Sequence, residues 1–170
     1  MANTITYVMQ PQLEQVQMSN GLTQLFIAAL TLSASALAQN DAQKTLAVWI
    51  ASHDQGMFGS GIVGFDVCEM PWDSSAIDRD KAFWFSVIEG ARAKFGWELW
   101  KYTPQEDWLL LRLEQFSALI EAFQPRDICD DQKRVWVFTP LPKTFNLCEQ
   151  HRLYLHEYGC LLCNDEAEQA

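Results

Sequence analysis

The sequence predicts a mainly α-helical protein of about four principal helices, bundle-like, with a small C-terminal zinc-bound β-hairpin. Apolar residues recur at helical spacing along several long stretches, and four potential metal ligands gather within the last 23 residues. A length of 170 residues fits one ordinary core with a small appended module. We therefore predict a helical domain, residues 1–132, and a zinc module, residues 133–170, packed on it.

The first helix is predicted to start at Pro11 and to run toward residue 39, with a break near Asn20. Its apolar part, Leu22–Ala38, resembles a secretory signal, but no basic residue precedes it. Its Ser and Thr residues dilute it too much for a membrane span. Because the first 43 residues carry only Glu14 and Asp41 as charges, we expect this helix to lie inside the bundle or against a partner.

A second helix is predicted from Asn40 to about Ser52, although the residues at 45–50 also suit a buried strand. Asn40 as a cap favours the helix. The Gly-rich connection that follows, residues 55–72, is too apolar to lie free in water, and one short strand is expected at Ile62–Val67. Its Gly59–Gly64 segment matches the dinucleotide fingerprint G-x-G-x-x-G without the required strand and helix around it, so we interpret it as a packing turn.

Two capping signals predict the third and fourth helices. Ser75–Asp78 matches a capping box, and the helix after it should stop at Gly96. Thr103–Glu106 combines an N-cap Thr with Pro at the first helical position. The two helices are expected to form an antiparallel pair. Their apolar stripes are Ile77, Trp84, Val87, Ile88, Ala91 and Phe95 on the third helix, and Leu109, Leu113, Phe116, Ile120 and Phe123 on the fourth.

Cys148, His151, Cys160 and Cys163 form a C-x2-H pair and a C-x2-C pair separated by eight residues. Each two-residue gap lets a tight turn direct two ligands at one point, and two such turns complete a tetrahedron around a metal. The sequence therefore predicts a structural Zn²⁺ whose four protein ligands leave no open position for catalysis. His156 is a rival ligand, but it would lie on the opposite face of a strand from His151.

The spacing of these pairs resembles the broad class of short zinc-ribbon knuckles over residues 146–164 only, and that class has many functions. Residues 134–138, which alternate in polarity, are predicted to form a short strand ahead of the hairpin. The tail from Asn164 to Ala170 is short, polar and acidic, and we expect it to be disordered.

Weaker candidates for catalysis flank the Gly-rich connection. His53, Asp66 and Cys68, with Asp54 and Glu69 beside them, contain a possible Cys68 nucleophile and His53 base. No spacing rule favours this pairing, and a lone Cys between apolar neighbours is more often a small buried residue. Capping of the second helix is the alternative role of His53 and Asp54.

The charge balance limits the partners. A net charge of −10 without a separate basic patch disfavours direct binding to nucleic acid, and no membrane partner is expected. Cys68 and Cys129 remain outside the metal pairs, which fits a reducing compartment better than a disulfide framework. The predicted location is therefore the cytoplasm.

We expect a non-enzymatic protein–protein interaction or regulatory module, with self-association or a partner protein at the first helix and residues 56–72. Trp97 and Trp100 are further candidate anchors. One alternative is a small enzyme with its active site in the His53–Glu69 region. Another is an acidic zinc-ribbon protein that acts on a nucleic-acid-binding partner. The sequence does not tell whether a small-molecule ligand binds.

Overall fold

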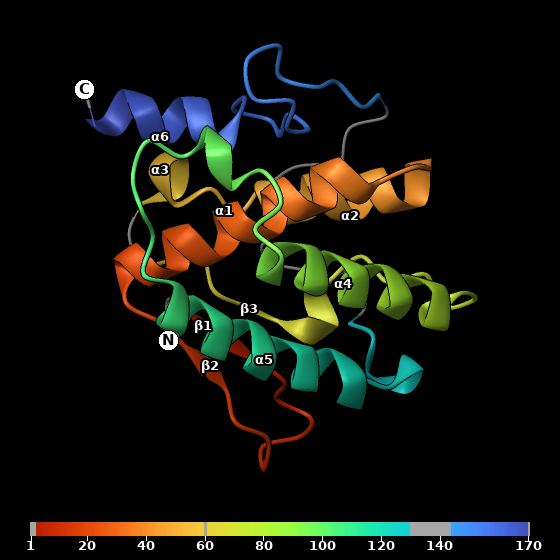
Figure 1. The fold of residues 1–170 in the computed structure, drawn as a ribbon. Coiled ribbons are helices and arrows are strands. Elements are labelled where there is room, and N and C mark those ends of the chain that lie inside the picture. Colours follow the sequence, from red (N-terminus) through yellow and green to blue (C-terminus); the bar gives the residue numbers. More distant parts are fainter. Residues whose placement is uncertain (1–2, 60, 130–143, 170) are drawn as a thin grey trace.

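A computed structural model describes residues 3–59, 61–129 and 144–169 (Figure 1). Within these ranges the protein is mainly α-helical, as predicted, with six α-helices and one small sheet. The helices are α1 (Asn20–Leu37), α2 (Asp41–Ala51), α3 (Gln55–Phe58), α4 (Ile77–Arg92), α5 (Glu106–Ala122) and α6 (Leu161–Gln169), and the strands are β1 (Thr4–Thr6), β2 (Val16–Gln17) and β3 (Phe65–Asp66).

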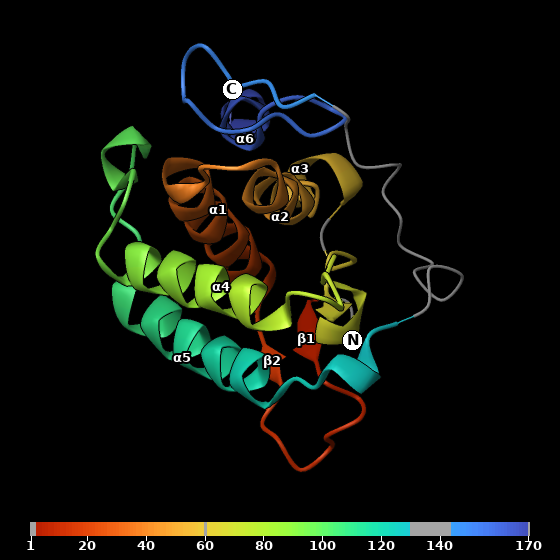
Figure 2. The same ribbon diagram turned by 90° about the vertical axis from the view of Figure 1, so that its right-hand side faces the viewer.

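Helix α1 lies at the centre of the fold and packs against α2, α4 and α5 (Figure 2). The prediction of a buried helix is confirmed, because its middle is buried on every face. Because α1 packs inside this fold, its lack of charged residues is explained without a partner protein. By length and composition α1 is the one helix among the described residues that could cross a membrane, yet 61% of it is buried in the structure.

The predicted start of this helix at Pro11 is wrong. Ser19 caps α1 instead, its Oγ accepting a hydrogen bond from Leu22 N, and the preceding residues turn back to form β2. Strand β1 lies between β2, antiparallel to it, and β3, parallel to it. Val16 and Ile5 pair across β1 and β2 and are both buried, so core burial of these side chains outweighs helix propensity in this segment.

The helical prediction for α2 is confirmed, and the Asn40 side chain accepts a hydrogen bond from Gln43 N at 3.0 Å. In the following connection β3 is shorter than the strand predicted at Ile62–Val67. Asp66 ends it and caps a short 3-10 helix, Val67–Glu69.

Helices α4 and α5 form the predicted antiparallel pair (Figure 2). Their capping differs from the prediction, since neither helix has a side-chain cap. Helix α4 begins at Ile77 with Ala76 at the N-cap position, so Ser75 lies one residue before the cap, and its N and Oγ donate to the Asp73 carboxylate at 2.9 and 2.6 Å. Helix α5 begins at Glu106, three residues after Thr103. Phe95, predicted in the buried stripe, lies beyond the end of α4 and is 40% exposed.

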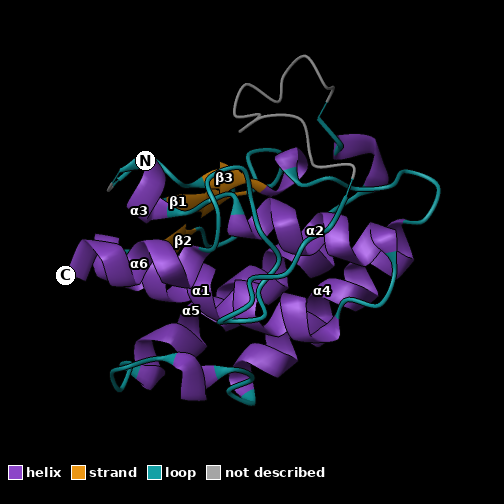
Figure 3. Ribbon diagram, turned by 90° about the horizontal axis from the view of Figure 1, so that it is seen from above, coloured by secondary structure: helices purple, strands orange, loops and turns teal. Residues whose placement is uncertain are grey.

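The bundle-like arrangement and the C-terminal hairpin are not confirmed. Residues 144–160 are mostly loop with two isolated β-bridges, Leu147 with Tyr154 and His156 with Gly159 (Figure 3). Helix α6 follows where disorder was predicted. The strand predicted at 134–138 and the domain boundary between residues 132 and 133 lie outside the described residues, and the two-part division stays a prediction.

The C-terminal segment covers one side of the helical body (Figures 1 and 2). Helix α6 packs against α3, and Tyr154 N donates to Ser35 Oγ of α1 at 3.2 Å. Leu153, Leu161 and Leu162 are buried in the same hydrophobic core as the helices. The predicted metal ligands are therefore attached to the core of the protein.

Candidate metal centre

The four predicted ligands come together at one point. The ligand atoms of Cys148, His151, Cys160 and Cys163 all lie within 4.8 Å of one another. Three of the residues are buried, and Cys163 is half-buried. A cluster of three thiols and one imidazole so close together can bind a metal ion.

The Cys148–His151 pair sits in a tight turn. Arg152 N donates to Cys148 O at 2.9 Å, and Cys148 N donates to Leu153 O at 2.8 Å. Arg152 adopts a left-handed conformation, φ 59°, which reverses the chain directly after His151. As a result, His151 Nδ1 lies 3.8 Å from Cys148 Sγ, and His151 N approaches the same sulfur at 3.5 Å.

The Cys160–Cys163 pair lies at the start of α6. Gly159 has φ 103°, a conformation that an L side chain rarely adopts, so this turn requires the glycine that precedes Cys160. Asn164 N donates to Cys160 O at 3.0 Å, and Cys163 follows in the first turn of the helix. The partial positive charge at a helix N-terminus favours thiolates over thiols there.

Without a metal the three thiols differ in acidity. Burial raises the pKa of Cys160 to about 12 and also raises the pKa of Cys163. Burial alone would raise the pKa of Cys148 too, but hydrogen bonds from the backbone N–H groups of His151 and Gln150 lower it to about 7. A bound dication would stabilise all three sulfurs as thiolates, since its charge replaces the water that burial removes.

Glu166 supports the centre from outside the ligand cluster. Its Oε1 lies 3.1 Å from His151 Nε2, the nitrogen that faces away from the sulfurs. A carboxylate at this position fixes the ring orientation and makes the opposite nitrogen a stronger ligand. Lys101 contacts the same oxygen at 3.4 Å. Sequence analysis missed Glu166, although its place one turn of helix after Cys163 was a usable signal.

His156, the rival ligand, is engaged elsewhere. Its Nε2 lies 2.9 Å from Asp54 Oδ2, and its Nδ1 accepts a hydrogen bond from Tyr158 N at 3.2 Å. Asn164 Nδ2 donates to the same Asp54 oxygen at 2.8 Å. Both His156 and Asp54 are almost fully buried. This pair therefore fastens the metal-binding segment to the start of α3.

The catalytic role of Cys68 and His53 stays a prediction, and the structure engages both side chains in other contacts. Cys68 forms a disulfide with Cys129, so it has no free thiol to act as a nucleophile. His53 is buried, its Nδ1 hydrogen-bonds Trp49 O at 2.9 Å, and burial lowers its pKa to about 4. Asp66 accepts hydrogen bonds from Thr6 Oγ1 and Cys68 N, which is a structural role.

The same disulfide overturns the expectation that Cys68 and Cys129 are unpaired. The residues are 61 positions apart, and their Cα atoms are 5.1 Å apart. Disulfides persist mainly in oxidising compartments, so the leftover cysteines no longer support the cytoplasm. The cytoplasmic location stays a prediction.

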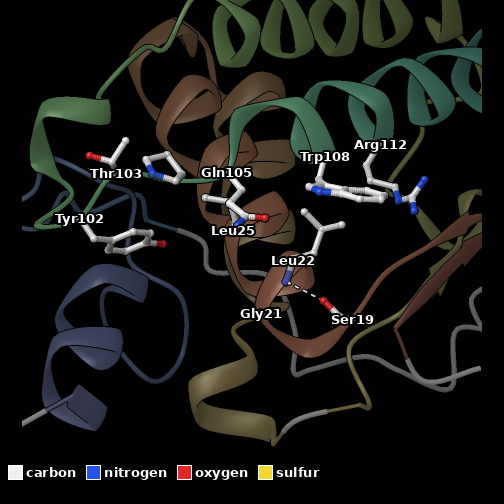
Figure 4. A pocket seen from close by; sticks show the side chains of 10 residues that line it. Ser19, Gly21, Leu22, Leu25, Tyr102, Thr103, Gln105, Trp108 and Arg112 are labelled. Carbon is white, nitrogen blue, oxygen red and sulfur yellow. Dashed lines mark hydrogen bonds between the residues drawn. The ribbon is translucent and has the colours of Figure 1, made fainter.

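A second feature that sequence analysis missed is a groove of about 620 Å³ between the starts of α1 and α5 (Figure 4). Tyr102 and Trp108 line it and are 50% and 56% exposed. The signal was present in the sequence, because position 108 falls outside the apolar stripe of α5. Trp97 and Trp100, the predicted anchors, are half-buried against the core.

The comparison with known proteins gives no relative. No protein-family model matches the chain, and neither a curated protein nor a solved structure does. The argument for function therefore depends on the residues described above.

Proposed function

We propose that the Cys148–Cys163 cluster binds one Zn²⁺. With Zn–S bonds of about 2.3 Å and a Zn–N bond of about 2.0–2.1 Å, a tetrahedral site separates two sulfurs by about 3.8 Å and nitrogen from sulfur by about 3.6 Å. Here two sulfurs, those of Cys148 and Cys163, are 3.7 Å apart, and His151 Nδ1 lies 3.8, 3.6 and 3.3 Å from the three sulfurs. This agreement is the observation that supports zinc most directly.

The proposed role of the ion is structural. Four protein ligands fill a tetrahedral shell and leave no position for water or substrate. The ion would join the turn at Cys148 to the start of α6 and so hold the C-terminal segment on α1 and α3. A zinc knuckle of this kind stabilises folding directly, because the unfolded chain does not present the four ligands together.

We further propose that the protein acts as a non-enzymatic interaction module. A metal shell filled by four protein ligands would leave no catalytic position, and the disulfide at Cys68 weighs against an active site in the His53–Glu69 region. In contrast, large apolar side chains are exposed near the metal centre and at the groove, among them Met57 at 44% and Tyr158 at 48%. An acidic zinc-ribbon protein that acts on a nucleic-acid-binding partner is a special case of this proposal.

Elemental analysis of the purified protein tests the metal. We expect one zinc per chain in the wild type and a clear loss of zinc in Cys160→Ser. The double variant Cys68→Ser/Cys129→Ser is the matched control, because it removes two cysteines outside the cluster and should keep one zinc. Unchanged zinc in Cys160→Ser, or a fully folded metal-free wild type, would overturn this part of the proposal.

Site-specific photo-cross-linking in the cell of origin tests the interaction. A photoreactive phenylalanine analogue replaces, one at a time, Val8, Met57, Tyr102, Trp108 and Tyr158, all of which are exposed. We expect neighbouring positions to capture one protein, which then binds as a purified component. Background adducts at every position, together with a strictly monomeric protein in light scattering, would overturn the interaction role.

A further inference from the structure

The groove between α1 and α5 combines three side chains of the types that dominate binding energy at protein interfaces. Trp, Tyr and Arg are enriched at such hot spots, and Trp108, Tyr102 and Arg112 line this one groove (Figure 4). Trp108 is 56% exposed and Tyr102 is 50% exposed, so both rings are accessible to a partner. Leu22 and Leu25 of α1 add an apolar wall.

The charge of the groove is distinct from that of the whole protein. The chain has a net charge of −10, yet among the residues that the structure describes Arg112 is the only charged one that lines the groove. Its Nη1 donates to the neutral Gln115 Oε1 at 3.0 Å, and no carboxylate of the described residues forms an ion pair with it. Its Nε is buried without a hydrogen-bond acceptor within the described part of the chain. Among the described residues, this cation of the groove therefore has no counter-ion.

One helix start adds to this preference. Residues of the first turns of α1 and α5 line the groove, but only α1 has no acidic residue in its first turn, whereas α5 has Glu106 and Asp107 there. The N-terminal partial charge of α1 is thus not offset locally, and it favours an anion in the same region as Arg112. Glu106 and Asp107 do not line the groove, and Lys94 pairs with Glu106 at 2.9 Å, so part of their negative charge is already offset.

We propose that this groove binds a short proline-containing segment of a partner protein that presents a carboxylate to Arg112. Extended proline-rich segments dock into aromatic-lined grooves and lose little entropy on binding, because their conformation is preformed. A volume of about 620 Å³ accommodates a short segment and not a long helix. This inference rests on the proposed interaction role and names the chemistry of the partner.

Fluorescence polarisation with three labelled peptides tests the proposal on the zinc-loaded full chain at 0.15 M salt. The peptides contain three repeats of Pro-Pro-Glu, of Pro-Pro-Gln, or of Gly-Ser-Glu. Because Pro-Pro-Glu is repeated, one of its carboxylates can lie near Arg112 in any register of binding. The Pro-Pro-Gln peptide is the neutral control, and the Gly-Ser-Glu peptide keeps the charge but lacks proline. We expect Pro-Pro-Glu to bind at least about fivefold more tightly than either of the others.

Variants locate the site. Trp108→Ala should weaken binding of Pro-Pro-Glu by about tenfold, which is the size of a hot-spot contact. Arg112→Gln should abolish the preference for Pro-Pro-Glu over Pro-Pro-Gln. Leu111→Ala is the matched control, because Leu111 is also exposed on α5, at 44%, but does not line the groove. It should leave both affinities unchanged.

Several results would overturn the proposal. These are equal binding of the Glu and Gln peptides, a preference that survives Arg112→Gln, no effect of Trp108→Ala, and no peptide binding at all. A dimer that Trp108→Ala dissociates would assign the groove to a second copy of this chain. Cross-links only from Met57 and Tyr158 would leave the interaction role intact and remove the groove from it.

Discussion

Glu166 offers a direct test of how the metal centre is built. Its carboxylate lies 3.1 Å from His151 Nε2, while Nδ1 of the same ring faces the three sulfurs. Replacing Glu166 with Gln keeps the shape and the acceptor oxygen of the side chain but removes its charge. The imidazole should then be a weaker ligand, because no anion compensates the positive charge that the ring gains on binding a metal.

The structure sets the size of the effect. Loss of a carboxylate behind a metal-binding histidine typically costs 10- to 100-fold in metal affinity. Glu166 is 28% exposed, and Lys101 and Gln150 also contact its carboxylate, at 3.4 Å each, so water and these groups share its charge. We therefore expect Glu166→Gln to weaken zinc binding by about tenfold, at the lower end of that range.

Competition against a chromogenic chelator at constant pH measures this affinity. Glu168→Gln is the matched control, because it makes the same change of net charge on the exposed end of α6. We expect its zinc affinity to stay at the wild-type value. Equal affinities for Glu166→Gln and Glu168→Gln would refute the supporting role of Glu166, and a fall in both would indicate a general charge effect.

Three further predictions concern the fold. In Gly90→Ala the new Cβ would overlap Ser33 Oγ of α1 and approach the Phe95 ring, so we expect a loss of about 2 kcal/mol in the free energy of unfolding, measured by denaturant. The Ser33→Ala/Gly90→Ala double variant should recover only part of this loss, because it also removes the hydrogen bond from Ser33 Oγ to Val87 O. The pKa of His53 is about 4 in the folded protein and about 6.5 in the unfolded chain, so the contribution of His53 to stability is present above pH 6.5 and is lost at lower pH, where the unfolded chain takes up a proton. Between pH 7 and pH 5 the free energy of unfolding of the wild type should fall by about 2 kcal/mol more than that of His53→Gln. The Cys68–Cys129 disulfide should make the intact mass without reductant about 2 Da lower than the reduced mass. Because the disulfide closes a long loop, Cys68→Ser/Cys129→Ser should lower the free energy of unfolding by about 2–4 kcal/mol, and an unchanged stability would contradict this role of the disulfide.

The predictions that succeeded depend on local spacing. The cluster of Cys148, His151, Cys160 and Cys163 is predictable because two-residue gaps constrain the turns at each pair, and these turns form in the structure. The long helices were identified because stripes such as Leu109, Leu113 and Phe116 repeat at the helical period over several turns. Both signals are strong over a short window of sequence.

The predictions that failed depend on tertiary contacts. Strand β2 is two residues long, and only its pairing with β1 and the burial of Val16 define it. Cys68 and Cys129 are far apart in the sequence, so their pairing follows from the fold alone. The Ser75 capping box is a local failure of another kind, because α4 begins at Ile77 and places Ala76, not Ser75, at the N-cap position.

The metal centre and the groove share one structural element, the segment that precedes α5. Lys101 reaches Glu166 of α6, and the next residue, Tyr102, forms one end of the groove. The ion pair itself contributes little, since the Lys101 side chain is 71% exposed and water screens it.

Coupling between the two sites must therefore come from the position of α6, which the Cys160 and Cys163 ligands fix and which packs beside residues 99–102. Removing the metal should loosen α6 and one wall of the groove while leaving Trp108 and Arg112 on α5 in place. We expect chelation to weaken binding of the Pro-Pro-Glu peptide by a few-fold, less than Trp108→Ala does, in the same polarisation assay. By linkage, the peptide should strengthen zinc binding by the same factor. An unchanged peptide affinity after chelation would mean that α5 and α1 alone shape the groove, because only they would then remain fixed.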